Sequence, residues 1–243
     1  MKDKIVIVGM GKVSGEVRTF IEEYELFDII AFSVNSEYMD GPEHDGLPVY
    51  PLEHLEDYID KSKVYTFVAA SDLNYLSLVK RDLYNYLKTN GFMVANLISP
   101  KADIHTKDYG DGNWFCGFSY IHYDTKIGSN NTFRPFSYLA HYSSVGSHNY
   151  IGVQSVMAGN SHCVDQCFFG VASTVFNTLT IGDKCIIGAR TIVKKNVPNY
   201  CLCKMVDGDV VVDQYGPLSI ELKLAPQKNP TRKTYEVNIK SVE

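Results

Sequence analysis

The chain has 243 residues, of which 45% are hydrophobic, 12% aromatic and 21% charged, a composition that supports a folded core and excludes a disordered polymer. The net charge of −5 argues against binding of nucleic acid, which requires clustered lysine and arginine. No apolar stretch approaches the roughly 20 residues that span a bilayer, and the polar start does not resemble a signal peptide. We therefore expect a cytoplasmic protein without membrane insertion, whose six cysteines are reduced.

The first hundred residues alternate short apolar runs with longer amphipathic ones, a pattern typical of strands and helices around a parallel sheet. The expected strands are 4–8, 28–33, 64–69 and 92–97, and the expected helices are 15–23, 52–59 and 73–90. Together they predict a small Rossmann-like α/β domain over residues 1–100.

A glycine-rich loop follows the first expected strand. Gly9, Gly11 and Gly15 have the spacing GxGxxxG, which allows a tight turn and lets main-chain N–H groups approach an anion at a helix start. A strand-to-helix turn without a ligand would show the same spacing. The functional interpretation places the phosphates of a nucleotide or nucleotide sugar over the loop, at the carboxyl ends of the strands. The residues predicted to bind this substrate are Gly9, Gly11, Lys12, Ser33, Asn35, Ser36, Ser71 and Asp72.

No acidic residue stands close behind the second expected strand, where one would bind the ribose of a dinucleotide. Hydride chemistry with NAD is therefore disfavoured.

From residue 115 onward the sequence repeats with a period of six. The first position of every hexad is apolar: Phe115, Ile121, Ile127, Phe133, Leu139, Val145, Ile151, Met157, Cys163, Phe169, Val175, Ile181, Ile187 and Val193. The second position is often glycine or alanine, and the fifth is usually small. This register predicts a parallel β-helix over residues 101–200, in which the first position points inward and three hexads form one coil. An antiparallel sandwich would instead show period two and frequent turn residues.

The repeat resembles the left-handed β-helix of the hexapeptide acyltransferases. Its combination with a Rossmann-like domain and the connecting segment 91–102, GFMVANLISPKA, resembles the bacterial sugar acetyltransferases of the sialic acid O-acetyltransferase type. These include N-acetyltransferases of UDP-4-amino sugars. The resemblance covers residues 4–200 and implies acetyl-CoA as co-substrate and a homotrimer. It does not explain the C-terminal extension, residues 201–243.

His141 is the candidate general base. Acyl transfer from a thioester needs a group that takes a proton from the attacking amine or hydroxyl, and histidine suits this role near neutral pH. His141 occupies the third position of its hexad, where side chains should point outward, and this is the place of the catalytic histidine in the family. It could also be one more outward polar residue. Counting by 18 predicts that His141, Gly159 and Asn177 stack in one column, with an N–H of Gly159 exposed to a thioester oxygen.

One departure from the family concerns the residue after this histidine, which is usually acidic and is Tyr142 here. A carboxylate beside a histidine base orients its ring and stabilises the imidazolium. Asp124 precedes Tyr142 by one coil, and we predict it as the substitute partner.

The resemblance also implies that coenzyme A lies between neighbouring subunits. Gly159, Asn177, Ala189 and Arg190 would then line its pantetheine, and Arg190, Lys194 and Lys195 would lie near its phosphates. The lysine pair could equally be a solvated end of the solenoid. No metal is expected, because the histidine spacing does not match that of zinc-dependent β-helix enzymes and the cysteines lack metal-binding spacing.

The leading hypothesis is an acetyl-CoA-dependent N-acetyltransferase of a nucleotide-linked amino sugar. O-acetylation of a sugar hydroxyl is the alternative within the same class. A catalytically silent β-helix that binds a nucleotide sugar or organises partner enzymes is the alternative from another class.

Overall fold

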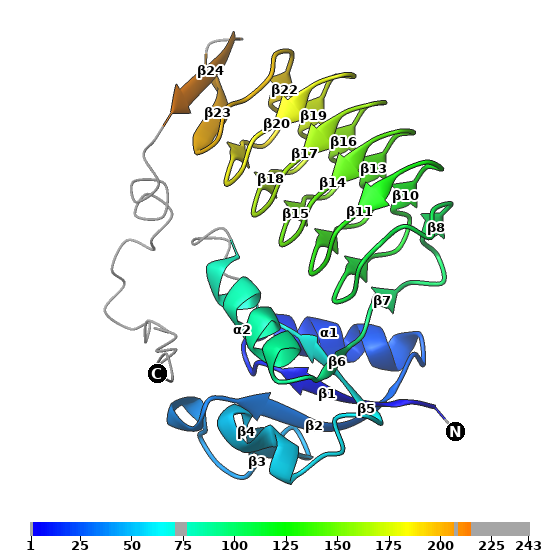
Figure 1. The fold of residues 1–243 in the computed structure, drawn as a ribbon, viewed down its shortest axis with the longest axis vertical. Coiled ribbons are helices and arrows are strands. Elements are labelled where there is room, and N and C mark those ends of the chain that lie inside the picture. The colour runs from blue at the N-terminus through cyan, green and yellow to red at the C-terminus, as the bar shows by residue number, and fades with distance from the viewer. Residues whose placement is uncertain (1, 71–76, 207–208, 215–243) are drawn as a thin grey trace.

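The computed structural model describes residues 2–70, 77–206 and 209–214, which form an N-terminal α/β unit followed by a long β-helix (Figure 1). The N-terminal unit has a six-stranded sheet in the order β3-β4-β2-β1-β5-β6, and every pair except β3–β4 is parallel. Its strands are β1 (Lys4–Val8), β2 (Asp28–Val34), β3 (Glu43–His44), β4 (Leu47–Pro51), β5 (Val64–Val68) and β6 (Met93–Val94). The helical segments are α1 (Lys12–Glu23), α2 (Leu78–Thr89) and the 3-10 turns η1 (Ser36–Tyr38) and η2 (Leu52–Asp57).

The first three expected strands are confirmed to within one residue, whereas the helix bounds differ more. Helix α1 begins at Lys12, because Gly11 is its N-cap. The segment expected as a helix over 52–59 is a short 3-10 turn, and the hairpin of β3 and β4 was not predicted. Strand β4 forms by parallel pairing with β2, which is a long-range contact. The polar and proline-containing sequence around β4 does not predict a strand there.

The expected strand 92–97 divides between the two parts of the molecule. Strand β6 (Met93–Val94) pairs with β5, whereas β7 (Leu97–Ile98) pairs with β9 (Trp114–Phe115) in the β-helix. Between them, Asn96 accepts a hydrogen bond from the Asn113 N–H through its Oδ1 at 2.8 Å. The chain thus enters the β-helix at Leu97, slightly before the boundary expected at residue 100.

Two-residue strands from successive hexads form the three sheets of the β-helix, and each strand between residues 114 and 175 pairs in parallel with the strand 18 residues further on. The first position of all fourteen hexads is buried, as the period predicts. The strands after β7 are β8 (Asp103–Ile104), β9 (Trp114–Phe115), β10 (Tyr120–Ile121), β11 (Lys126–Ile127), β12 (Thr132–Phe133), β13 (Tyr138–Leu139), β14 (Ser144–Val145), β15 (Tyr150–Ile151), β16 (Val156–Met157), β17 (His162–Cys163), β18 (Phe168–Phe169), β19 (Thr174–Val175), β20 (Thr180–Ile181), β21 (Ile186–Ile187) and β22 (Ile192–Val193).

The expected C-terminal extension begins with a hairpin that continues the stack. Strand β23 (Cys201–Val206) pairs in parallel with β21, and β24 (Asp209–Gln214) pairs antiparallel with β23. No helix in the described ranges is both long enough and apolar enough to cross a membrane.

Three corners connect the sheets, and we name each by its most distinctive residues. The histidine corner follows β10, β13, β16 and β19; the asparagine corner follows β11, β14, β17 and β20; and the phenylalanine corner follows β9, β12, β15, β18 and β21. The fourth residue of each hexad, at these corners, has a positive φ, for example 58° at Tyr142 and 63° at His148. Every corner therefore repeats the same left-handed turn, which keeps equivalent side chains in register from coil to coil.

Side chains that point inward at the asparagine corner form a continuous hydrogen-bonded ladder. The Asn131 Oδ1 accepts the Asn149 N–H at 2.8 Å, and the Asn131 Nδ2 donates to the Gly146 carbonyl at 2.8 Å. Cys167 continues the ladder, since its Sγ donates to the Gly182 carbonyl at 3.0 Å. The small-residue pattern of the sequence did not predict these fully buried asparagines.

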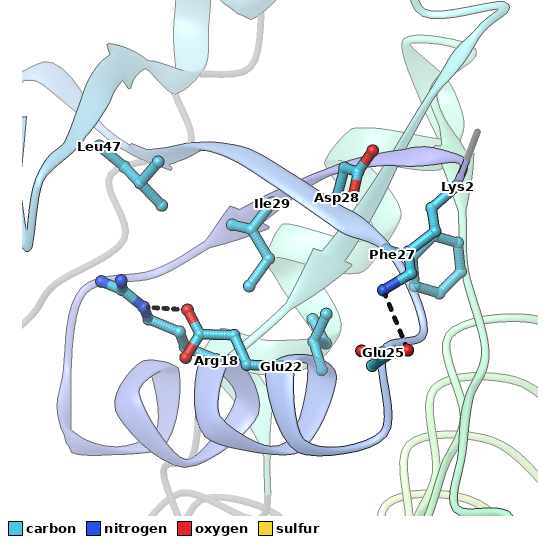
Figure 2. A pocket seen from close by; sticks show the side chains of 9 residues that line it. Lys2, Arg18, Glu22, Glu25, Phe27, Asp28, Ile29 and Leu47 are labelled. Carbon is cyan, nitrogen blue, oxygen red and sulfur yellow. Dashed lines mark hydrogen bonds and ion pairs between the residues drawn. The ribbon is translucent and has the colours of Figure 1, made fainter.

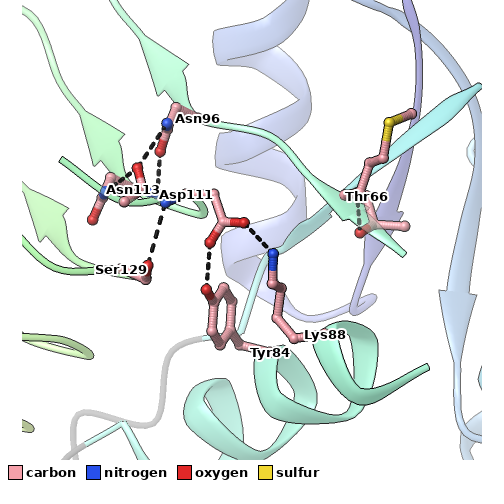
Figure 3. A network of polar contacts seen from close by, with 9 residues as sticks. Thr66, Tyr84, Lys88, Asn96, Asp111, Asn113 and Ser129 are labelled. Carbon is pink, nitrogen blue, oxygen red and sulfur yellow. Dashed lines mark hydrogen bonds and ion pairs between the residues drawn. The ribbon is translucent and has the colours of Figure 1, made fainter. Parts of the chain in front are cut away.

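The N-terminal unit is bound to the β-helix through α1 and α2. Figure 3 shows Asp111 accepting hydrogen bonds from the Tyr84 hydroxyl and the Lys88 ammonium group. Lys80 is buried and donates to the Asn130 carbonyl and the Thr132 hydroxyl, both at 3.0 Å. These contacts hold α2 against the asparagine corner.

Candidate active site

The predicted column at the histidine corner is present. His141, Gly159 and Asn177 each stand two residues after a strand, and these strands, β13, β16 and β19, are neighbours in one sheet. The Asn160 N–H donates to the His141 carbonyl at 2.9 Å, and the Thr178 N–H donates to the Gly159 carbonyl at 3.1 Å. The imidazole of His141 is exposed on this column.

Gly159 lies directly against the imidazole of His141. A Cβ atom at residue 159 would stand 2.8 Å from the His141 Cε1, closer than real Cβ contacts, so only glycine leaves the ring in place. The Gly159 N–H has no hydrogen-bond acceptor among the residues that the structure describes. At the asparagine corner, by contrast, side chains accept the equivalent N–H groups, as Asp165 does for Ser147 at 2.7 Å. A free main-chain donor thus lies beside the histidine.

Two aromatic rings contact His141 edge to face. The centroid of the His122 ring lies 5.4 Å from that of His141 at an interplanar angle of 78°, and the Tyr142 ring lies 5.4 Å away at 77°. His122 was not among the site residues predicted from the sequence. The signal that could have singled it out is its hexad position, the second, which holds small Ala140 and Ala158 in the next two coils.

Asp124 is exposed at the histidine corner, one coil below Tyr142. No hydrogen bond or ion pair within the described part of the chain joins its carboxylate to His141. Its role as the partner of the histidine remains a prediction.

Comparison with solved structures identifies the fold. The structure matches a variant of perosamine N-acetyltransferase from Caulobacter crescentus, in complex with CoA and GDP-perosamine, with a TM-score of 0.71 and 22% identity over 86% of this chain and 97% of that one. It matches the acetyltransferase domain of PglB from Neisseria gonorrhoeae, in complex with acetyl coenzyme A, with a TM-score of 0.71 and 15% identity over 84% and 96%. WeeI from Acinetobacter baumannii matches with a TM-score of 0.70 and 20% identity over 85% and 99%.

The chain has the left-handed β-helix fold of the sugar acetyltransferases. No protein-family model and no curated protein sequence matches it.

The residues predicted to bind coenzyme A lie at two different corners of the β-helix. Gly159 and Asn177 belong to the histidine corner, whereas Ala189 and Arg190 belong to the phenylalanine corner, where the Arg190 N–H donates to the Val171 carbonyl at 2.9 Å. Lys194 and Lys195 follow β22 and are exposed. No ion pair within the described ranges involves Arg190 or either lysine. The structure therefore does not bring this set together within one chain.

The glycine loop has the geometry expected of a tight strand-to-helix turn. Gly9 has a φ of 119°, and a Cβ there would lie 2.9 Å from the Ala69 carbonyl oxygen, so the position requires glycine. The Gly9 N–H donates to the Ser33 carbonyl at 2.8 Å, which joins the carboxyl ends of β1 and β2. Gly11 and Lys12 are exposed at the start of α1, where main-chain N–H groups favour an anion.

The other residues predicted to bind the nucleotide sugar differ in burial and in whether the structure describes them. Ser33 is fully buried and its hydroxyl has no partner among the described residues. Asn35 and Ser36 lie at the carboxyl end of β2, and the Ser36 hydroxyl donates to the Glu53 carboxylate at 3.1 Å. Glu53 was missed because it follows β4, an unpredicted strand. Ser71 and Asp72 lie outside the described residues.

A separate pocket of about 340 Å³ lies between α1 and the start of β2 (Figure 2). Four of its charged groups pair with one another, Arg18 with Glu22 at 2.8 Å and Lys2 with Glu25 at 3.6 Å. Because it adjoins the amino end of β2, it is distinct from the predicted nucleotide site at the carboxyl ends.

All six cysteines are free and buried. Burial raises the pKa of the Cys116 and Cys203 thiols to about 12. They are therefore poor nucleophiles, since the thiolate is the reactive form. In the part of the chain that the structure covers, no group of three or more potential ligands could hold a metal ion.

Proposed function

We propose that this protein is an acetyl-CoA-dependent N-acetyltransferase that acts on a nucleotide-linked amino sugar, with His141 as general base. The observation that carries the proposal is the imidazole of His141 packed on Gly159, whose N–H is free. The fold supports it, because the Caulobacter neighbour was crystallised with CoA and GDP-perosamine and the Neisseria neighbour with acetyl coenzyme A.

In this proposal the amine nitrogen attacks the thioester carbon directly. A carbon–nitrogen bond forms, the carbon–sulfur bond breaks, and His141 accepts the proton that the nitrogen loses. The Gly159 N–H is available to donate to the oxygen that gains negative charge, and removal of such a donor in other enzymes costs roughly two to three orders of magnitude in rate. No acyl-cysteine is needed, which agrees with the buried thiols.

The proposed enzyme is a homotrimer. Most large apolar side chains left exposed in the described ranges gather on the sheet of β10, β13, β16, β19 and β22 and on its two flanking corners. They are Phe118, Tyr123, Phe136, Tyr138, Tyr142, Val171, Phe176 and Ile192. A contiguous apolar face of this kind marks an interface. A neighbouring copy on this face would bring the histidine corner of one chain near the phenylalanine corner of another, which unites the two groups of predicted coenzyme A residues.

The N-terminal unit, which we interpret as Rossmann-like, would hold the nucleotide sugar. Its packing against the β-helix, for example Phe20 on Trp114 with ring centroids 5.5 Å apart, involves the sheet of β9 and β12 rather than the sheet that leads to His141. A sugar bound at Gly9 and Gly11 would therefore reach the histidine of a neighbouring subunit. The start of α1, where no side chain caps the helix, supports an anionic ligand at this loop.

The test is release of coenzyme A from acetyl-CoA with a panel of UDP-, dTDP- and GDP-linked 4-amino sugars. We expect turnover with at least one sugar, and a fall of 10²-fold to 10⁴-fold in the His141→Ala variant, the usual contribution of a general base. Unchanged oligomeric state and ligand binding in the variant would show that its fold is intact. Unchanged turnover in His141→Ala would refute the assignment of the base.

Two outcomes would favour the alternatives. Turnover with hydroxyl sugars but not with amino sugars would indicate an O-acetyltransferase. Thermal stabilisation by a nucleotide sugar without turnover would favour a binding module, an alternative motivated by Tyr142 in place of an acidic residue.

A further inference from the structure

Glu53 lies at the carboxyl edge of the N-terminal sheet. Strands β2 and β4 pair in parallel, with Val34 opposite Pro51, so both strands end at the same edge (Figure 1). Two residues beyond Pro51, the Glu53 Oε2 accepts the Ser36 N–H and the Ser36 hydroxyl, both at 3.1 Å. The Glu53 Oε1 accepts the same N–H at 3.2 Å. A carboxylate from β4 is thus held beside the first residues that follow β2.

These bonds leave part of the Glu53 carboxylate open to a ligand. A carboxylate has about four lone-pair positions, whereas Ser36 supplies one N–H and one O–H. The neighbouring Glu56 pairs with Lys61 at 3.2 Å, but no ion pair within the described ranges involves Glu53. The Glu53 side chain is exposed. An accessible hydrogen-bond acceptor therefore has a fixed orientation at this edge of the sheet.

The place of Glu53 matches the ribose of a nucleotide whose phosphates lie at the glycine loop. Strand β1, which leads into that loop, is the neighbour of β2, and the Gly9 N–H donates to the Ser33 carbonyl between their carboxyl ends. Neighbouring strands lie about 4.8 Å apart, and the ribose is the group attached to the diphosphate, so it would lie over the end of β2. Dinucleotide-binding folds have a carboxylate at this point, which accepts the ribose 2′-hydroxyl.

We propose that Glu53 accepts a hydrogen bond from the ribose 2′-hydroxyl and thereby selects ribonucleotide sugars, such as UDP- or GDP-linked ones, over dTDP-linked ones. This inference rests on the proposed function and narrows its substrate class. A carboxylate can only accept, and a 2′-deoxyribose lacks the hydroxyl that would donate to it. The deoxyribonucleotide would therefore cover Glu53 without giving it a partner, which weakens binding. Ser36 acts as a positioning residue, because its hydroxyl donates to Glu53.

The experiment measures nucleotide binding to the full chain by calorimetry with two matched pairs, UDP with dUDP and GDP with dGDP. Each pair keeps the base constant. We expect the ribonucleotide to bind at least about tenfold more tightly in the unmodified protein, the usual effect of a hydrogen bond to a charged group. The ratio should fall below about threefold in Glu53→Gln, which removes the charge, and in Glu53→Asp, which withdraws the carboxylate by one methylene group.

Glu37→Gln is the matched control, because Glu37 is an exposed carboxylate in η1, next to Ser36. This variant should keep the ratio of the unmodified protein. Equal affinities within each pair in the unmodified protein would overturn the proposal. A ratio that both Glu53 variants preserve, or that Glu37→Gln abolishes, would overturn it as well.

Thermal midpoints identify a variant that merely unfolds. Ser36→Ala then decides, because it keeps the Glu53 carboxylate but removes one of its bonds, and we expect an intermediate ratio. An unchanged ratio in Ser36→Ala, with the Glu53 variants unfolded, would overturn the proposal. A preference for ribonucleotides without turnover would refute the proposed enzyme and support the role of Glu53. Absence of binding by every nucleotide would refute both.

Discussion

The histidine corner and the asparagine corner have the same backbone turn but differ in the partners of their outward N–H groups. At the asparagine corner, buried amides join successive coils, and side chains such as Asp165 accept the outward N–H groups. At the histidine corner serines take the inward positions, as Ser143 does in accepting the Ser161 N–H at 3.2 Å, whereas the outward Gly159 N–H has no acceptor in the described part of the chain. The contrast teaches that one repeated turn can satisfy its outward N–H groups at one corner and leave such groups without a described acceptor at another.

The largest stability effect should come from the asparagine ladder. In Asn131→Ala the Asn149 N–H and the Gly146 carbonyl, each 2.8 Å from the amide, lose their partner in the interior. Two unsatisfied buried groups and a small cavity should lower the free energy of unfolding by about 3 kcal/mol. Ser143→Ala, the matched change at the histidine corner, removes a smaller group whose bonds to the Ser161 N–H and the Ala158 carbonyl are longer, at 3.2 and 3.1 Å, and should lower it by about 2 kcal/mol. Urea unfolding measures both, and equal losses would contradict the contrast between the corners.

The next effect concerns activity rather than stability. Gly159→Ala should reduce turnover by about 10-fold to 100-fold. The new methyl carbon would lie 2.8 Å from the Cε1 atom of His141 and would therefore displace the imidazole ring. Gly146→Ala at the asparagine corner is the matched variant, since its Cβ would lie 2.7 Å from the Val164 carbonyl oxygen without touching His141. We expect Gly146→Ala to lower the thermal midpoint more than Gly159→Ala does. We expect Gly159→Ala to lower kcat more than Gly146→Ala does.

A pH effect should appear at the asparagine corner. Burial, together with the Lys80 charge, lowers the pKa of His148 to about 4 from its ordinary value of 6.5. The unfolded chain therefore binds this proton first, so the stability that the neutral ring provides is complete above pH 6.5 and is lost as the pH falls toward 4. His148→Gln should remove up to about 2 kcal/mol of the stability difference between pH 7 and pH 5. Unfolding in urea at the two pH values measures it, and an unchanged difference would show that His148 is not the group responsible.

The smallest effect should come from Asp124→Asn. The carboxylate is exposed and makes no described contact with His141, so we expect a change in kcat of less than about threefold. A larger fall, with a shifted pH profile, would support Asp124 as the partner of the histidine.

Sequence reasoning predicted the β-helix far better than the N-terminal unit. In the hexad repeat the strands from β9 to β22 pair with neighbours 18 residues away, so a local period determines the inward positions and the column of His141 and Gly159. In the N-terminal sheet, β4 acquires its place only by pairing with β2, which no periodicity reveals. His122 was missed for a related reason, because its contact runs diagonally between two hexad positions and depends on how the ring is turned.

Because equivalent corners stack, the length of the β-helix can change only in fixed steps. Insertion of a complete 18-residue coil below β13 would move His141 along the axis by one interstrand spacing, about 4.8 Å, with every corner rebuilt. Insertion of a single residue would instead turn each later apolar first position out of the interior. The distance between the histidine and the N-terminal unit of the same chain can thus change during evolution only in steps of one coil.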